Sequence, residues 1–308
     1  MKLFKYIIYI SPILVFMAIS SYHDLHKRDL GTKNNPVKLY FTPALDANRI
    51  TSSAKELVEF LEKETGYYFE TAVPTSYIAV VEAFGTKKAD IAGINTFSYL
   101  MAHEKYGAEA RLRIVREGGD TTYKGCFLTR VDSGIDSLAD LNGRSIAYVD
   151  PSSTSGYILP KAMLSRRGIK PSEEVFAMKH DNVVTMIYQK QVDAGATYYS
   201  APNPKTGLVM DARMRVLQQF PDVVKKVKII GFTEAIPNDP YVFRKDMPEE
   251  MKRKIVNAFL KFVSTEKGRK AMFEIADITG LMKTSDSDYD GLRKMLKEEN
   301  ISLSGVIK

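Results

Sequence analysis

Hydrophobic side chains change their spacing several times along the chain, from a period of two to a period of nearly four. Residues 37–41 alternate between apolar and polar positions, as a half-buried strand does. Ala54, Leu57, Val58 and Leu61 recur at the spacing of one helical face, and Gly66 ends that segment. The pattern therefore begins as a strand followed by a helix.

The same alternation of strand and helix continues through most of the chain. Strands are predicted at 37–41, 67–73, 89–94, 123–128, 144–149, 175–178, 192–197 and 227–232. Helices are predicted at 77–84, 97–106, 137–141, 154–167 and 182–190, with a helical tail in which Ile255, Ala258, Phe259 and Phe262 share a face. Strands alternating with helices favour an α/β fold with parallel sheets covered by helices.

Two such sets predict two lobes joined by a hinge. The chain is expected to cross between them near residues 127–131 and 231–243. Lobe 1 would comprise residues 37–127 plus 244–308, and lobe 2 would be an insertion of residues 128–243.

The N-terminus carries an export pattern. Lys2 and Lys5 precede an apolar stretch, and Ala18-Ile19-Ser20 supplies small residues where a signal peptidase cleaves. Residues 1–20 are predicted to be a signal peptide, with an uncleaved anchor as the alternative, and residues 21–36 a polar tether. The protein is therefore expected in the periplasm or another extracytoplasmic space.

Composition narrows the class. The 308 residues are 44% hydrophobic and carry a formal net charge of +7, with positive charges interleaved with acids, which argues against nucleic-acid binding. Cys126 is the single cysteine, so an internal disulfide and an N-terminal lipid-bearing cysteine are both excluded. No metal or cofactor motif is found, and His23 and His26 in the tether give metal binding no support.

One turn concentrates candidate chemistry. Asp150-Pro151-Ser152-Ser153-Thr154-Ser155-Gly156 joins a predicted strand to a predicted helix. Free amides, several hydroxyls and the positive end of a helix dipole together form a site for a small anion. No Lys or Arg lies in this turn, which favours an oxyanion held by neutral donors. An ordinary Ser/Thr helix cap is the alternative.

This turn, within residues 138–157, resembles a motif of the periplasmic phosphate/phosphite/phosphonate-binding proteins of ABC importers. Four further segments resemble that family in order along the chain: residues 76–83, 89–92, His180 with Gln191-Val192-Asp193, and Ile236-Pro237-Asn238-Asp239-Pro240. The resemblance runs from about residue 37 to 270. It implies a type II periplasmic-binding-protein-like fold, a non-enzymatic role, no cofactor, a monomer, and a permease in the inner membrane as partner.

The resemblance also implies a ligand site for a phosphonate or phosphite. Ser153, Thr154 and Ser155 would hold the phosphorus oxygens, and Tyr77 would donate its hydroxyl from the opposite lobe. His180 would contact the oxyanion or brace the turn, and Asp239 would face the rest of the ligand. Packing, a core histidine and turn chemistry are the structural alternatives for Tyr77, His180 and Asp239.

The chain departs from the family pattern at two places. Gly93-Ile94-Asn95 lacks a family tyrosine, so Tyr99 is expected to replace it. Ser200 stands where aminoalkylphosphonate binders carry a carboxylate, so an aminated ligand is disfavoured.

Two other functions stay open from the sequence. A sensory binding subunit of the same fold is one. The other is a serine acyltransferase or β-lactamase-like enzyme, suggested by Ser52-x-x-Lys55 and Lys205-Thr206-Gly207.

Overall fold

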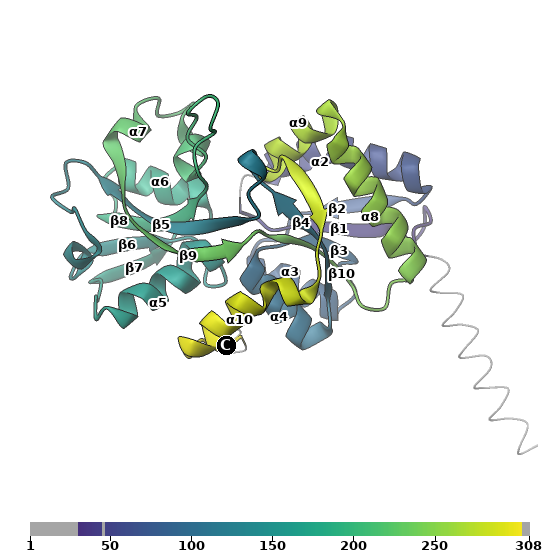
Figure 1. Cartoon of the computed structure of the whole chain (residues 1–308), viewed down its shortest axis with the longest axis horizontal. Coiled ribbons are helices and arrows are strands. Elements are labelled where there is room, and N and C mark those ends of the chain that lie inside the picture. Colours follow the sequence, from purple (N-terminus) through teal and green to yellow (C-terminus); the bar gives the residue numbers. More distant parts are fainter. Residues whose placement is uncertain (1–29, 45–46, 304–308) are drawn as a thin grey trace, which may run out of the picture.

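The computed structural model describes residues 30–44 and 47–303. The predicted signal peptide, most of the tether, and His23 and His26 lie outside the described residues. Within the described part, no helix combines the length and the apolar character needed to span a membrane. The chain forms two sheets, each with its own covering helices, which lie side by side (Figure 1).

The first sheet has six strands in the order β11-β4-β10-β3-β1-β2. Strand β1 pairs in parallel with β2 and β3, whereas β10 is antiparallel to β3 and β4, and β11 is antiparallel to β4. The strands are β1 (Val37–Phe41), β2 (Phe69–Ala72), β3 (Ile91–Gly93), β4 (Glu109–Val115), β10 (Pro240–Phe243) and β11 (Gly280–Lys283). We call this sheet with its helices the six-stranded lobe.

Helices cover both faces of this sheet. One face packs in a single apolar cluster with α2 (Ala47–Thr65), α8 (Glu249–Ser264) and α9 (Glu266–Ala276). The other face carries α3 (Tyr77–Gly85), α4 (Thr96–Tyr106) and α10 (Asp290–Glu298). The predicted face of α2 is the buried one, since Ala54, Leu57 and Leu61 are inaccessible to solvent.

The second sheet has five strands in the order β7-β6-β8-β5-β9, and we call it with its helices the five-stranded lobe. Its strands are β5 (Thr122–Arg130), β6 (Ser145–Tyr148), β7 (Glu173–Phe176), β8 (Ala194–Tyr199) and β9 (Val227–Pro237). Helix α5 (Leu159–Arg166) packs on one face, and α6 (His180–Tyr188) and α7 (Val223–Lys226) pack on the other. Short turns η1 (Glu117–Gly119), η2 (Leu138–Leu141), η3 (Thr154–Ile158), η4 (Ala212–Val216) and η5 (Asp286–Tyr289) complete the described elements.

The sheets are mixed, which corrects the prediction of parallel sheets. Strand β5 is antiparallel to both β8 and β9, and only β6 pairs in parallel, with β7 and β8. The sequence pattern missed β4, β10 and β11. Strands β10 and β11 reach the sheet from distant parts of the chain, whereas β4 follows α4 directly and alternates between buried and partly buried residues as an ordinary strand does.

The chain also passes between the lobes earlier than predicted. All of β5 belongs to the five-stranded sheet, so the first crossing precedes Thr122 instead of lying at residues 127–131. The return falls between β9 and β10, at Asn238 and Asp239. The described end of the predicted tether is packed as well: Leu30 is buried in the α2 cluster, and the Tyr68 amide donates to the Gly31 carbonyl at 2.8 Å.

Candidate functional site

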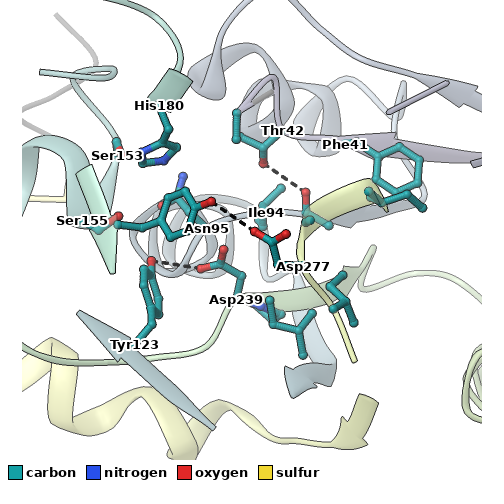
Figure 2. Close-up of a pocket in the computed structure, with 18 of the residues that line it drawn as sticks. Phe41, Thr42, Ile94, Asn95, Tyr123, Ser153, Ser155, His180, Asp239 and Asp277 are labelled. Atoms are coloured by element: carbon teal, nitrogen blue, oxygen red, sulfur yellow. Dashed lines mark hydrogen bonds between the residues drawn. The ribbon is translucent and has the colours of Figure 1, made fainter. Parts of the chain in front are cut away.

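A cavity of about 110 Å³ lies between the two lobes. The six-stranded lobe contributes Tyr77 and Asn95 to its wall, and the five-stranded lobe contributes Ser153, Ser155 and His180. Figure 2 shows Asn95, Ser153, Ser155 and His180 around one space, with Asp239 and Asp277 beside them. Both lobes therefore supply polar groups to the same cavity.

The Ser/Thr turn forms the start of the helix that follows β6. The Ser153 hydroxyl oxygen accepts a hydrogen bond from the Gly156 amide at 3.1 Å, which caps the turn, and its own proton remains available. The turn is a π-type turn, with the Tyr157 and Ile158 amides both donating to the Ser153 carbonyl. The first amides of the turn lack an intrahelical acceptor, so they and the hydroxyls can donate to an anion.

Gly156 is required by the close packing of this turn. A Cβ atom at this position would lie 2.4 Å from Val149 Cγ2 and 2.9 Å from the Ser153 hydroxyl. Any larger residue would displace the turn that presents Ser153 and Ser155 to the cavity.

Thr154 has a different environment from its two neighbours. Its hydroxyl donates to Asn95 Oδ1 at 2.9 Å and accepts from the Phe97 amide at 2.9 Å. Thr96 also donates to it, at 3.2 Å. Thr154 is not among the residues that line the cavity. Its side chain instead joins the five-stranded lobe to the beginning of α4 in the six-stranded lobe.

Tyr77 lies opposite the Ser/Thr turn, at the start of α3. Ser76 caps this helix by accepting from the Ala79 amide at 3.2 Å. The Tyr77 side chain is buried and its hydroxyl has no hydrogen-bond partner among the described residues. Burial and the neighbouring carboxylates of Asp150 and Asp239 raise its pKa well above the usual value. The hydroxyl is therefore a permanent donor for which the described part of the chain provides no acceptor.

His180 begins α6 and lines the same cavity. One ring nitrogen, Nδ1, lies 2.7 Å from the Thr197 hydroxyl, and the ring packs edge-on against Tyr198. Burial, with the positive charges of Arg116 and Arg215, lowers the pKa of His180 to about 3. The imidazole is therefore neutral at pH 7.

Asp239 lies in the second crossing between the lobes. The Tyr123 hydroxyl donates to its Oδ1 at 3.3 Å (Figure 2). Burial raises the pKa of Asp239 to about 6, against the opposing effects of Arg116 and Tyr123. This carboxyl therefore changes charge just below neutral pH.

Three charged residues of the wall were missed from the sequence: Arg116, Arg215 and Asp277, which we call the arginine cluster. Arg215 in η4 forms a salt bridge with Asp277 across the two lobes, and both side chains are 3% exposed. Tyr198 joins them, because its hydroxyl donates to Asp277 at 3.1 Å and accepts from Arg215 Nε at 3.2 Å.

No sequence signal marks these three residues. Arg116 follows β4, a strand that the periodicity did not reveal, and its guanidinium lies over the rings of Tyr123 and Tyr198. Asp277 ends α9 in the left-handed conformation, with φ of 56°. Its side chain reaches the cavity only because α9 packs against the six-stranded sheet.

Two residues singled out in the sequence lie elsewhere. Tyr99 does not line the cavity, because its side chain points toward η5, where its hydroxyl donates to Asp286 and its ring packs on Tyr289. The structure thus does not bring Tyr99 to the place of the missing family tyrosine. Ser200 is buried just after β8, also outside the lining, and its hydroxyl has no partner among the described residues.

The residues behind the enzyme hypothesis are not assembled into a site. Ser52 and Lys55 lie on α2, whereas Lys205 and Thr206 lie in a turn after β8. None of them lines the cavity. Among the described residues, no group of three or more metal-ligating side chains is found either.

Comparison with known proteins places the chain in a family. The family described as "ABC transporter, phosphonate, periplasmic substrate-binding protein" matches residues 39–289. The chain is 26% identical over 278 residues to the phosphate-import protein PhnD of Mycolicibacterium smegmatis, covering 83% of this chain and 84% of that protein. It is 24% identical over 242 residues to the phosphonates-binding periplasmic protein of Escherichia coli, covering 76% of this chain and 68% of that protein.

A solved structure supports the fold. PhnD1 from Prochlorococcus marinus, determined in complex with methylphosphonate, superposes with a TM-score of 0.72 at 16% identity and covers 86% of this chain and 98% of that one. The two-lobe periplasmic-binding-protein fold inferred from the sequence is thereby confirmed. With the family matching more than three quarters of its length, this chain belongs to the periplasmic substrate-binding proteins of phosphonate ABC transporters.

Proposed function

We propose that the cavity between the lobes captures a small phosphorus oxyanion, phosphonate or phosphite, for delivery to an ABC permease. The observation that carries this proposal is the buried hydroxyl of Tyr77, which lines the cavity opposite the Ser/Thr turn and has no partner among the described residues. A buried donor without an acceptor costs about 1–3 kcal/mol, and an oxyanion between the lobes would remove that cost.

The residues around Tyr77 suit such a ligand. Ser153 and Ser155 offer hydroxyls from the opposite wall, and neutral His180 offers one nitrogen beyond its contact with Thr197. Donors from two lobes surround an oxyanion only when the cleft is closed, so binding would couple to closure. Thr154, already bonded to α4, would contribute by holding the lobes together and not by holding the phosphorus oxygens.

The charged residues of the cavity wall also determine which substituent the ligand can carry. An ammonium group would meet Arg116 and Arg215, two like charges, in the same small cavity. The carboxylates Asp239 and Asp277 are engaged by Tyr123 and by Arg215, respectively. We therefore expect phosphite or methylphosphonate to bind at least ~10-fold more tightly than 2-aminoethylphosphonate, a difference of about 1.4 kcal/mol.

Calorimetric titration of the purified full-length chain with phosphite, methylphosphonate, phosphate and 2-aminoethylphosphonate tests this proposal. Equal or tighter binding of the aminated ligand would show that the two carboxylates outweigh the two arginines. If none of the four compounds binds, the ligand is not a phosphorus oxyanion.

A matched pair of variants tests the observation itself. Tyr77 and Tyr148 are both buried tyrosines whose hydroxyls lack a partner among the described residues, but only Tyr77 lines the cavity. Tyr77→Phe should weaken methylphosphonate binding by about 10- to 100-fold, the effect of one charge-assisted hydrogen bond, and Tyr148→Phe should leave it unchanged. Equal effects of the two substitutions would show that Tyr77 does not contact the ligand.

Three finer features belong to the same proposal. The protein would act as a monomer without catalytic activity, and residues 1–20 would direct its export, with retention as an anchor as the alternative. Co-purification with a permease and an ATPase would distinguish a transport role from a sensory one. Mass determination of the exported protein would distinguish cleavage from anchoring.

A further inference from the structure

Arg116 is a buried cation without an ion-pair partner among the described residues. It lines the cavity and is 7% exposed. Its Nη1 donates to the Ala276 carbonyl at 3.2 Å, whereas its Nε has no partner within residues 30–44 and 47–303. Among the residues that the structure describes, none forms an ion pair with Arg116, although Arg215 beside it is paired with Asp277.

The salt bridge in the arginine cluster is itself incomplete. Arg215 uses Nη2 and Nε for Asp277 and Tyr198, so its buried Nη1 has no partner in the part of the chain that the structure describes. Asp277 uses Oδ2, and its buried Oδ1 likewise has no partner among the described residues. The cluster thus offers two unpaired guanidinium donors and one unpaired carboxylate oxygen.

Asp239 is the remaining acid that could balance Arg116. Its Oδ1 instead accepts from the Tyr123 hydroxyl, and it lies beyond ion-pair distance of Arg116. The pKa of Asp239 is raised to about 6, so most of its negative charge remains at neutral pH. Asp239 therefore offsets the positive charge of Arg116 only at a distance.

Buried charges in proteins are paired, because an isolated ion loses its hydration without compensation. We infer that Arg116 and the free Nη1 of Arg215 form a second subsite that binds an anionic oxygen group, such as a carboxylate, on the substituent of the phosphorus ligand. This inference rests on the proposed function, in which the Ser/Thr turn and Tyr77 hold the phosphorus group itself.

The chemistry of the cluster selects among substituents. A carboxylate accepts from both guanidinium donors, and such bonds are shorter and stronger than neutral ones. An ammonium group donates only, so it would leave both donors unpaired and add a third positive charge. An alkyl group would leave all three atoms unpaired.

The size of the cavity agrees with a ligand that has a substituent. A water molecule needs roughly 10–15 Å³ on the same scale, so the cavity of about 110 Å³ holds several water-sized groups. A bare phosphite would leave part of that space unfilled.

A series of phosphonates of similar length tests the subsite: phosphonoacetate, ethylphosphonate and 2-aminoethylphosphonate, titrated calorimetrically into the full-length chain. We expect phosphonoacetate to bind about 10-fold more tightly than ethylphosphonate, with the aminated compound weakest. Arg116→Met should abolish the advantage of phosphonoacetate while changing ethylphosphonate less than about threefold. Arg116→Lys should retain part of that advantage, because it keeps the charge but loses the planar donor pair.

Arg113→Met is the matched control, because Arg113 lies on β4, the strand that Arg116 directly follows, contacts Met282 and does not line the cavity. This substitution should change none of the three affinities. Thermal unfolding of each variant checks that it is folded, and Arg116→Lys carries the test if Arg116→Met does not fold.

The outcomes separate this inference from the proposed function. If the wild-type chain binds these phosphonates but their order does not depend on Arg116, the subsite is wrong and the proposed function stands. If Arg116→Met weakens all three equally, Arg116 serves the phosphorus group and again the subsite is wrong. If the wild-type chain binds none of them, the proposed function fails and the subsite fails with it.

Discussion

The Ser/Thr turn and the arginine cluster line the same cavity but are built in opposite ways. The turn offers neutral hydroxyl donors and is local: Ser153 caps its own helix, and the whole motif lies within seven consecutive residues. The cluster is charged and is assembled from η4 and from the residues that follow β4 and α9, which belong to two lobes. The Ser153 cap thus depends on one lobe alone, whereas the Arg215–Asp277 pair requires contact between both lobes.

This difference suggests a division of labour. A neutral helix start binds an oxyanion with little dependence on the rest of the molecule. The buried salt bridge between Arg215 and Asp277 is formed only when its two lobes meet, so it reports closure. We therefore expect substitutions in the turn to act on ligand contacts and substitutions in the cluster to act on closure and on the choice of substituent.

The largest effect is expected from removing the hydroxyls of the turn. Replacing Ser153, Thr154 and Ser155 together by Ala removes two donors to the ligand and the Thr154 bonds to α4, but keeps the backbone amides. Methylphosphonate binding should weaken at least ~100-fold, since each charge-assisted hydrogen bond contributes about 1.5–3 kcal/mol. The free energy of unfolding should fall by about 1 kcal/mol for the lost cap. The buried Asn95 and Phe97 groups that lose Thr154 should lower it by about 1–3 kcal/mol more. Unchanged affinity by calorimetry would mean that the ligand lies elsewhere.

The next effect concerns the salt bridge of the cluster. Asp277→Asn keeps a residue type that tolerates the left-handed backbone but leaves Arg215 without its counter-charge. Breaking a buried pair costs about 3–5 kcal/mol, and opening the cleft relieves that cost by hydrating Arg215. We expect a larger radius of gyration by solution scattering without ligand, and weaker binding by about tenfold or more. An unchanged radius would show that the pair does not hold the lobes together.

Thr154 should show a smaller effect that separates closure from ligand contact. Thr154→Val keeps the shape of the side chain but removes the hydroxyl that bonds Asn95 and the Phe97 amide. We expect about tenfold weaker binding, mostly through faster dissociation. Thr154→Ser should restore most of the affinity, because it keeps the hydroxyl. Equal loss in the Ser variant would point to packing instead of hydrogen bonding.

The smallest effect is a pH dependence at Asp239. Its pKa is raised to about 6, so it is ionised at pH 7.5 and largely protonated at pH 5. Asp239→Asn should bind methylphosphonate a few-fold more tightly than wild type at pH 7.5, because a negative charge is removed near the anion, and equally well at pH 5. Comparing both proteins at each pH cancels the titration of the ligand. A constant ratio between the two pH values would contradict the raised pKa.

The raised pKa of Asp239 also makes the free energy of unfolding depend on pH. Its folded pKa lies above the value in the unfolded chain, so protonation favours the folded state. The contribution of Asp239 to the free energy of unfolding is therefore present at low pH and is lost as pH rises through about 6. His180 acts in the opposite sense, because its pKa is lowered to about 3, and its contribution is lost as pH falls below 6.5. Urea unfolding of Asp239→Asn and wild type across this range would measure the first effect.

Local features of the molecule could be predicted from the sequence. The period of apolar residues located β1 and the buried face of α2, because each is set by contacts between near neighbours in the chain. The Ser/Thr turn was found for the same reason: strand, turn and helix are consecutive, and a helix start presents its amides wherever it folds. Tyr77 and His180 were found by resemblance, and the structure places both in the cavity wall.

The rest was decided by tertiary structure. Strands β10 and β11 pair with β4 although they lie more than a hundred residues away from it in the sequence. The local spacing of hydrophobic residues therefore cannot predict that the sheets are mixed. Tyr99 was expected at the cavity, but the rotation of α4 directs it to Asp286. Arg116, Arg215 and Asp277 lie far apart in the sequence and are ordinary charged residues until the lobes close. Burial then strengthens the Arg215–Asp277 pair and leaves Arg116 without an ion-pair partner among the described residues, because electrostatic interactions strengthen where water is excluded.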